Sequence, residues 1–217
     1  MALLKLISFH LLALFVVGGV SYEKTDIILP PRDDSSKIAP IASLIFIQGA
    51  DIPNDAYIPL AEAIQQSSRL RLWIGIPSYR NNTVNPLTIY AGIERTLTEM
   101  KLQGMRADSY YYAGHSLGGA TLQMWVNESY SSSSIDGQIL MGSFITRVYK
   151  NDYIFSYPVP TLTIGGELDG LARVTRIAES YYTQLLDPQL QGKDNSRDFP
   201  VTVCKGPSLP SKAHHKA

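Results

Sequence analysis

The chain has 217 residues, a length that suits one domain with a substantial hydrophobic core. Lysine plus arginine and aspartate plus glutamate balance at 19 each, and no long run of either sign occurs. This balance gives no indication of a nucleic-acid partner or of an acidic membrane surface as a binding site. The hydrophobic share of 45% is ordinary for a globular protein.

Residues 1–21 have the features of a secretory signal peptide. Lys5 supplies a positive start, residues 11–17 are apolar, and small residues follow as a cleavage site. The apolar run is too short to span a bilayer comfortably, so we expect cleavage and no membrane span after it. The mature protein should then be secreted. Asn81 and Asn127 stand in N-glycosylation sequons, which fit that route.

Strand-like and helix-like segments alternate along the rest of the chain. Apolar runs typical of strands cover residues 26–30, 42–47, 70–76, 109–113, 138–141, 161–164 and 199–203. Helical spacing covers residues 59–66, 86–102, 120–126 and 173–186. This alternation predicts an α/β fold with a doubly wound, mainly parallel sheet. We expect one domain over residues 22–203 and an irregular tail over 204–217.

A Gly-x-Ser-x-Gly motif lies where the fourth of these strands gives way to a helix. Gly114, Ser116 and Gly118 form the motif, and Gly119 follows it. In this setting the motif is typical of a nucleophile elbow, a strained turn that lifts the serine oxygen clear of the sheet. The glycines are needed because the tight turn leaves no room for side chains. The motif therefore predicts Ser116 as a nucleophile, although the bare pattern also arises by chance.

Two further motifs flank the elbow in the sequence. Gln48-Gly49-Ala50 follows an apolar strand directly, and a second apolar strand ends in Gly165-Gly166-Glu167-Leu168-Asp169. With these three motifs in this order, the chain from about Ala42 to Val203 resembles the α/β-hydrolase family. It is most similar to the compact esterase, chlorophyllase and dienelactone-hydrolase-type members.

The resemblance implies an oxyanion hole built from two backbone amides. The residue after the first glycine and the residue after the nucleophile would supply them, which here are Ala50 and Leu117. Family members usually carry histidine where this chain has Gln48. Because the donors are backbone groups, this substitution by itself need not abolish the hole. The alternative is an ordinary turn at the end of a strand.

The resemblance also implies a triad acid in the loop after residues 161–164. The family's spacing from Gly166 favours Asp169, with Glu167 as the second choice. Its carboxylate would fix the orientation of an imidazole and stabilise the imidazolium. The alternative is that Asp169 only caps the helix that follows.

At the position of the catalytic base the chain departs from the family. The usual spacing after the last strand places Leu209 where the histidine should stand. His10 leaves with the signal peptide, and the backbone at His115 should direct its ring away from the nucleophile. His214 and His215 are then the remaining candidates for the base. Their tail is broken by prolines, so the family's closing helix should be missing too.

A missing closing helix would leave part of one sheet face uncovered. Loss of the base and the helix together is typical of an altered C-terminus, from an alternative transcript or a shifted reading frame, or of a non-enzyme descendant. Residues 144–158, where many lipases insert a lid, form only a brief tyrosine-containing loop. A lidless cleft suits small or accessible esters.

The function that we expect is hydrolysis of a small-molecule carboxylic ester through an acyl-enzyme on Ser116, with no cofactor and no metal. The alternative is a catalytically inactive, hydrolase-like secreted protein or a truncated isoform that lacks the base. An enzyme with a cysteine nucleophile is disfavoured, because the elbow holds serine and Cys204 is far along the chain. The oligomeric state is left open.

Overall fold

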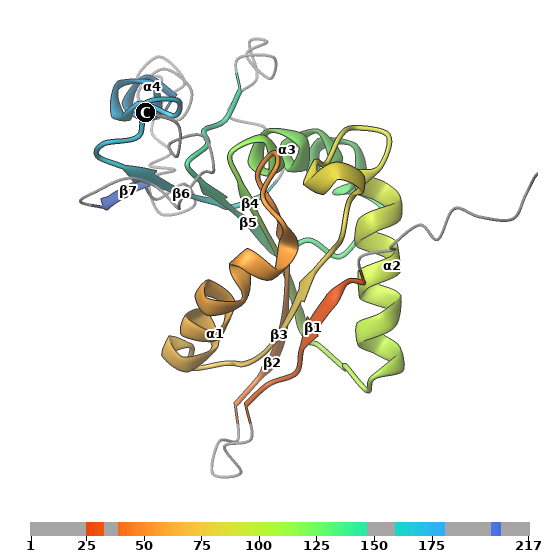
Figure 1. Ribbon diagram of the computed structural model, residues 1–217. Coiled ribbons are helices and arrows are strands. Elements are labelled where there is room, and N and C mark those ends of the chain that lie inside the picture. Colours follow the sequence, from red (N-terminus) through yellow and green to blue (C-terminus); the bar gives the residue numbers. More distant parts are fainter. Residues whose placement is uncertain (1–24, 33–38, 147–158, 181–200, 205–217) are drawn as a thin grey trace, which may run out of the picture.

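A computed structural model describes residues 25–32, 39–146, 159–180 and 201–204 (Figure 1). The expected signal peptide over 1–21 and most of the tail over 204–217 lie outside the described residues. Within the described ranges, no helix has both the length and the apolar character needed to cross a membrane.

The strands of the described residues form one seven-stranded sheet in the order β1-β3-β2-β4-β5-β6-β7. Their bounds are Ile27–Leu29 (β1), Ile41–Ile47 (β2), Arg71–Ile76 (β3), Ser109–His115 (β4), Gly137–Met141 (β5), Thr161–Gly166 (β6) and Val201–Cys204 (β7). Strand β1 pairs antiparallel with β3 at one edge, and every other neighbouring pair is parallel. The predicted doubly wound, mainly parallel sheet is therefore confirmed.

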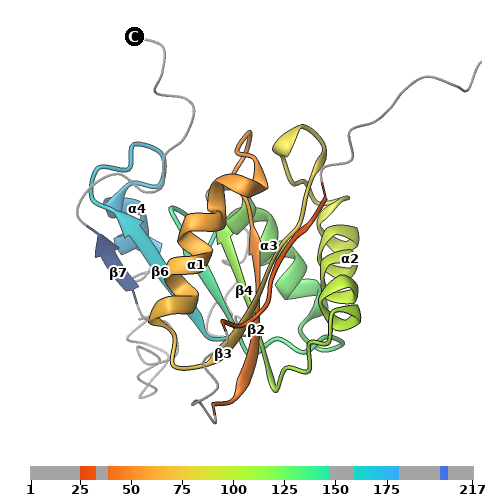
Figure 2. The ribbon, with the colours of Figure 1, turned by 60° about the horizontal axis from the view of Figure 1, so that its bottom comes forward.

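The helices lie on both faces of this sheet. Their bounds are Ile58–Ser67 (α1), Ile89–Leu102 (α2), Leu117–Ser129 (α3) and Val174–Ser180 (α4), with short 3-10 turns at Asn54–Tyr57 (η1) and Arg80–Asn82 (η2). Figure 2 shows α1 in front of the sheet and α2 and α3 behind it. This two-sided cover explains why the strands are apolar on both faces.

Helix α2 begins three residues later than its sequence pattern predicts. The Asn85 side chain accepts hydrogen bonds from the amides of Leu87 and Thr88 at 2.9 and 3.2 Å. These bonds hold a turn through Pro86, so the helix starts only at Ile89. The expected apolar face is confirmed, since Ile89, Ile93, Leu97 and Met100 are all buried.

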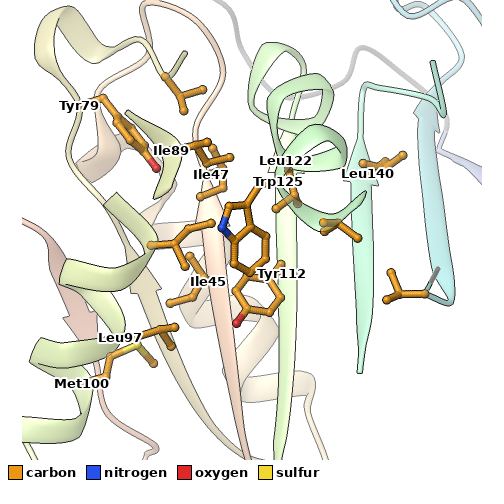
Figure 3. Packing of buried hydrophobic residues seen from close by; sticks show 14 of the residues in the cluster. Ile45, Ile47, Tyr79, Ile89, Leu97, Met100, Tyr112, Leu122, Trp125 and Leu140 are labelled. Atoms are coloured by element: carbon orange, nitrogen blue, oxygen red, sulfur yellow. The ribbon is translucent and has the colours of Figure 1, made fainter. Parts of the chain in front are cut away.

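The larger core cluster lies between the sheet and helices α2 and α3 (Figure 3). Trp125 of α3 packs on Tyr112 of β4, with ring centroids 4.7 Å apart. Ile45 and Ile47 of β2 complete the sheet side of this cluster. Burial of these side chains fixes α3, and with it the elbow at the start of α3, to the sheet.

The opposite face is covered less evenly. Around α1, Leu44, Phe46 and Ile74 are buried, with Tyr57 and Ala61 packed on them. Farther along this face, four apolar side chains of β5 and β6 are only partly buried: Ile139, Met141, Leu162 and Ile164. The expectation that part of one face would lack cover stays a prediction. The segment that would hold a closing helix lies outside the described residues.

Candidate active site

Ser116 occupies a strained turn between β4 and α3. Its backbone has φ 50° and ψ −119°, in a region that non-glycine residues rarely adopt. Such strain costs about 1–3 kcal/mol and persists only where the surroundings enforce it. Here the Ser116 amide donates to Met141 of β5 at 2.9 Å, and its carbonyl accepts from Ala120 of α3 at 3.1 Å. The serine is partly exposed, as a nucleophile must be.

The glycines around Ser116 are required by close backbone contacts. A β-carbon at Gly114 would stand 2.6 Å from the Gly119 α-carbon. A β-carbon at Gly119 would stand 2.7 Å from the Ser143 β-carbon, and one at Gly118 only 2.4 Å from the carbonyl oxygen of Gln48. The first turn of α3 therefore lies directly against the end of β2.

The loop after β2 is held by hydrogen bonds on either side of Ala50. The Gly49 amide donates to the Tyr57 hydroxyl at 2.8 Å, and the Gly49 carbonyl accepts from the Ile52 amide at 3.4 Å. The Asp51 amide donates to the Thr83 hydroxyl at 3.1 Å. Within the described residues, the Ala50 amide has no acceptor, and Ala50 itself is exposed.

The Leu117 amide lies in the first turn of α3, where helix geometry leaves amides without a partner. The helix dipole adds partial positive charge at this end. Because Gly118 touches Gln48, the segments that carry the Leu117 and Ala50 amides are adjacent. These are the two amides that the sequence predicted as oxyanion donors. The arrangement can stabilise negative charge that develops next to Ser116.

His115 points away from solvent and is only 4% exposed. Its Nδ1 atom is hydrogen-bonded to the Tyr57 hydroxyl at 2.8 Å. Burial lowers the pKa of His115, and the nearby carboxylate of Asp169 opposes this by raising it. The imidazole is thus a buried group tied to Tyr57, as expected of a residue directed away from the reaction.

Asp169 lies in the turn after β6. One carboxylate oxygen accepts hydrogen bonds from the amides of Leu171 and Ala172 at 2.8 and 2.9 Å. This is the capping role that the sequence left open. The same carboxylate acts electrostatically on His115, beside the elbow. Asp169 therefore caps the turn before α4 and lies within electrostatic range of His115, the residue before Ser116. Glu167 is exposed.

The candidate bases His214 and His215 lie outside the described residues, as does Leu209. His115 is the only histidine that the structure describes.

The sequon residues Asn81 and Asn127 are both exposed; Asn127 lies in the last turns of α3. In the part of the chain that is described, no group of three or more His, Cys, Asp or Glu side chains could hold a metal ion.

Sequence reasoning missed two residues that support the loop after β2. Tyr57 comes from η1 and Thr83 from the segment after η2, and neither belongs to one of the three catalytic motifs. Thr83 had a signal only as the third residue of the Asn81 sequon. Nothing in the local pattern of Tyr57 indicates that its hydroxyl reaches Gly49.

Comparison with known proteins agrees with this geometry. The model of the alpha/beta hydrolase family matches residues 43–186, about two thirds of the chain. No curated protein sequence matches the chain.

Solved structures with a similar fold include three hydrolases of low sequence identity. Carboxylesterase CesB (YbfK) from Bacillus subtilis is 15% identical, with a TM-score of 0.52, and the match covers 84% of this chain and 80% of that one. A predicted CIB-like hydrolase from Thermoplasma acidophilum is 15% identical, with a TM-score of 0.55 and coverage of 83% and 81%. XC6422 from Xanthomonas campestris, an a/b serine hydrolase without lid, is 14% identical, with a TM-score of 0.51 and coverage of 84% and 77%. At such identities the likeness concerns the fold alone.

Proposed function

Because the chain belongs to the alpha/beta hydrolase family, we propose that it is a serine hydrolase that cleaves carboxylic esters through an acyl-enzyme on Ser116. The observation that carries this proposal is the backbone of Ser116, which is held in a strained turn where the segment of the Leu117 amide touches the segment of the Ala50 amide. Strain of this kind is retained at functional sites.

In the proposed reaction the Ser116 hydroxyl oxygen attacks the ester carbonyl carbon and loses its proton to a histidine. The negative charge on the carbonyl oxygen is stabilised by the Ala50 and Leu117 amides. The tetrahedral intermediate expels the alcohol, which takes the proton from the histidine. Water then attacks the acyl-enzyme with the same histidine as base, releasing the acid and restoring Ser116. Asp169 orients the histidine and stabilises its charged form.

His214 or His215 is the proposed base. The ring of His115 is buried and hydrogen-bonded through Nδ1 to Tyr57, which argues against His115 as the base. This same observation favours one rival function. If neither tail histidine reaches Ser116, the chain is a catalytically inactive, hydrolase-like protein that acts by binding.

The proposed setting is the secretory pathway. The signal-like segment over residues 1–21 supports it, and so does the exposure of both sequon asparagines. Expression in a secreting cell should yield protein in the medium that starts near residue 22. N-terminal sequencing of intracellular protein that retains residues 1–21, with none in the medium, would contradict this.

A fluorophosphonate probe tests the nucleophile directly. We expect the probe to label the wild type and not Ser116→Ala, since the probe reports an activated serine. The matched control is Ser132→Ala, which removes an exposed hydroxyl far from the elbow in the sequence and should leave labelling unchanged. Absence of labelling in protein with a cooperative unfolding transition would overturn the enzyme proposal and favour the inactive protein.

The base is tested by His214→Ala and His215→Ala, singly and together. We expect one single variant to lose ester turnover by about 10²-fold or more, the order of a general-base contribution. Full turnover in the double variant would exclude both tail histidines.

A further inference from the structure

We propose that Tyr57 is a positioning residue that holds the oxyanion-hole loop against the nucleophile elbow through two buried hydrogen bonds. The proposal rests on the proposed function in naming Ala50 as an oxyanion donor. It goes beyond that function by assigning a role to a residue outside every motif of the site.

The Tyr57 hydroxyl stands between the two segments that make the site. It accepts the Gly49 amide at 2.8 Å and contacts His115 Nδ1 at 2.8 Å. Gly49 precedes the proposed donor Ala50, and His115 precedes the proposed nucleophile Ser116. A β-carbon at Gly49 would lie 2.7 Å from His115 Nδ1. The backbone of Gly49 is therefore in van der Waals contact with the His115 ring.

Counting protons fixes the direction of both bonds. The Gly49 amide can only donate, so the hydroxyl accepts there. The hydroxyl's single proton is buried and has His115 Nδ1 as its acceptor among the described residues. Tyr57 therefore donates to Nδ1, and the neutral imidazole carries its own proton on Nε2. Burial raises the pKa of Tyr57 to about 12, which keeps the phenol protonated in this role.

These bonds determine where the Ala50 amide points. The Gly49 carbonyl, bound to Ile52, belongs to the peptide plane between Gly49 and Ala50, and the Gly49 amide, bound to Tyr57, belongs to the plane before it. The two bonds therefore hold the loop on both sides of the Gly49 α-carbon. In a trans peptide the carbonyl and the following amide point in opposite directions. The Ala50 amide is consequently directed out of the loop, free to meet an oxyanion. An oxyanion donor works only when its position is set before the reaction.

The Tyr57 ring is placed independently of its hydroxyl. It packs on Phe46 of β2 with ring centroids 4.8 Å apart, and it lies 5.9 Å from the His115 ring. Tyr57→Phe keeps this packing and removes only the oxygen, so the variant should fold. The chain also offers a matched control. Tyr79 is similarly buried, at 7% exposed against 3% for Tyr57, but its hydroxyl has no hydrogen-bond partner among the residues that the structure describes.

The kinetic test compares Tyr57→Phe with Tyr79→Phe on a p-nitrophenyl ester. We expect Tyr57→Phe to lower kcat by about 10-fold or more with KM within about twofold, because a misplaced donor weakens transition-state binding. Tyr79→Phe should change neither constant by more than about twofold. Equal kcat in the wild type and Tyr57→Phe would overturn the proposal while leaving the proposed function intact.

A second variant tests the same arrangement from the His115 side; if Tyr57→Phe fails to fold, an unchanged kcat in His115→Leu overturns the proposal. His115→Leu leaves the Gly49 bond in place and removes the acceptor of the hydroxyl proton. If the two hydrogen bonds of the Tyr57 hydroxyl act together, His115→Leu also lowers kcat. The double variant is then no slower than Tyr57→Phe. Additive losses of kcat would show that Tyr57 and His115 act separately, and would overturn the proposal that the two bonds act together.

A structural readout decides the matter even if the wild type proves inactive. Amide hydrogen exchange at Gly49 should accelerate by about 10-fold or more in Tyr57→Phe and stay unchanged in Tyr79→Phe. The ¹⁵N resonances of His115 should show Nε2 protonated and Nδ1 bare in the wild type. Unchanged Gly49 exchange would overturn the positioning role, whereas inactive wild type with accelerated exchange would overturn only the proposed function.

Discussion

The α-carbon of Gly118 lies against the main chain of Gln48, so closely that a β-carbon at Gly118 would stand 2.4 Å from the Gln48 carbonyl oxygen. This contact joins the elbow helix α3 to the end of β2, so the segments that carry the Ala50 and Leu117 amides are adjacent. Neither partner can move easily, since both are main chain.

Gly118→Ala should therefore destabilise the protein and lower ester turnover together. Overpacking of a well-packed site costs about 1–3 kcal/mol, and here the added methyl meets backbone atoms. Gly170→Ala is the control for stability, because a β-carbon at Gly170 has no atom within 4 Å. Urea unfolding measures the stability of the two variants, and an ester assay measures their turnover. Equal urea midpoints for Gly118→Ala and Gly170→Ala would contradict the crowding at Gly118.

Asp169→Asn should separate the two roles of Asp169. Asparagine keeps an oxygen that can accept from the Leu171 and Ala172 amides, so the free energy of unfolding should change little. It removes the negative charge that a catalytic imidazole needs, so turnover should fall on the order of 10³-fold or more. Asp169→Ala should lose turnover and also about 1 kcal/mol of stability. Full turnover in Asp169→Asn would exclude Asp169 as the triad acid and leave it only the capping role.

Buried His115 makes stability depend on pH. Its pKa is lowered in the folded protein, so the unfolded chain binds a proton first as the pH falls. The free energy of unfolding should therefore fall as pH drops below the unfolded value of about 6.5, by at most about 1.4 kcal/mol per pH unit. The fall should level off below the folded pKa. In His115→Gln, this contribution to the change of the unfolding free energy with pH should disappear. Chemical unfolding at pH 7.5, 6.5 and 5.5 measures the difference, and parallel slopes would refute it.

Thr83 combines an observed loop contact with a proposed role in glycosylation, and substitutions can separate the two. Its hydroxyl is part of the Asn81 sequon and also accepts the Asp51 amide beside Ala50. Asn81→Gln should remove a glycan and leave turnover unchanged, whereas Thr83→Ala should remove the glycan and lower turnover. Thr83→Ser should retain both. Gel mobility after glycosidase treatment, read alongside ester turnover, tests this; equal turnover in Asn81→Gln and Thr83→Ala would exclude a role of Thr83 in the loop.

The fold and most of the proposed site could be predicted from the order of the amino acids. Apolar runs and helical spacing are local properties, so β2, β4 and the buried face of α2 could be located without a structure. The start of α2 was misplaced, because the Asn85 turn depends on a side chain folding back on its own amides. Ser116 and Asp169 stood in recognisable motifs for a similar reason: a strained turn and a strand end demand glycines nearby.

How these pieces are held together could not be predicted from local patterns. The sheet order places β2 beside β4, and that neighbourhood brings Gly49 to His115 and the Tyr57 hydroxyl between them. Such contacts join residues far apart in the chain, and no local pattern encodes them. The sequence predicted a nucleophile, two oxyanion donors and a triad acid. The register of the parallel strands determines which side chains hold these groups in position.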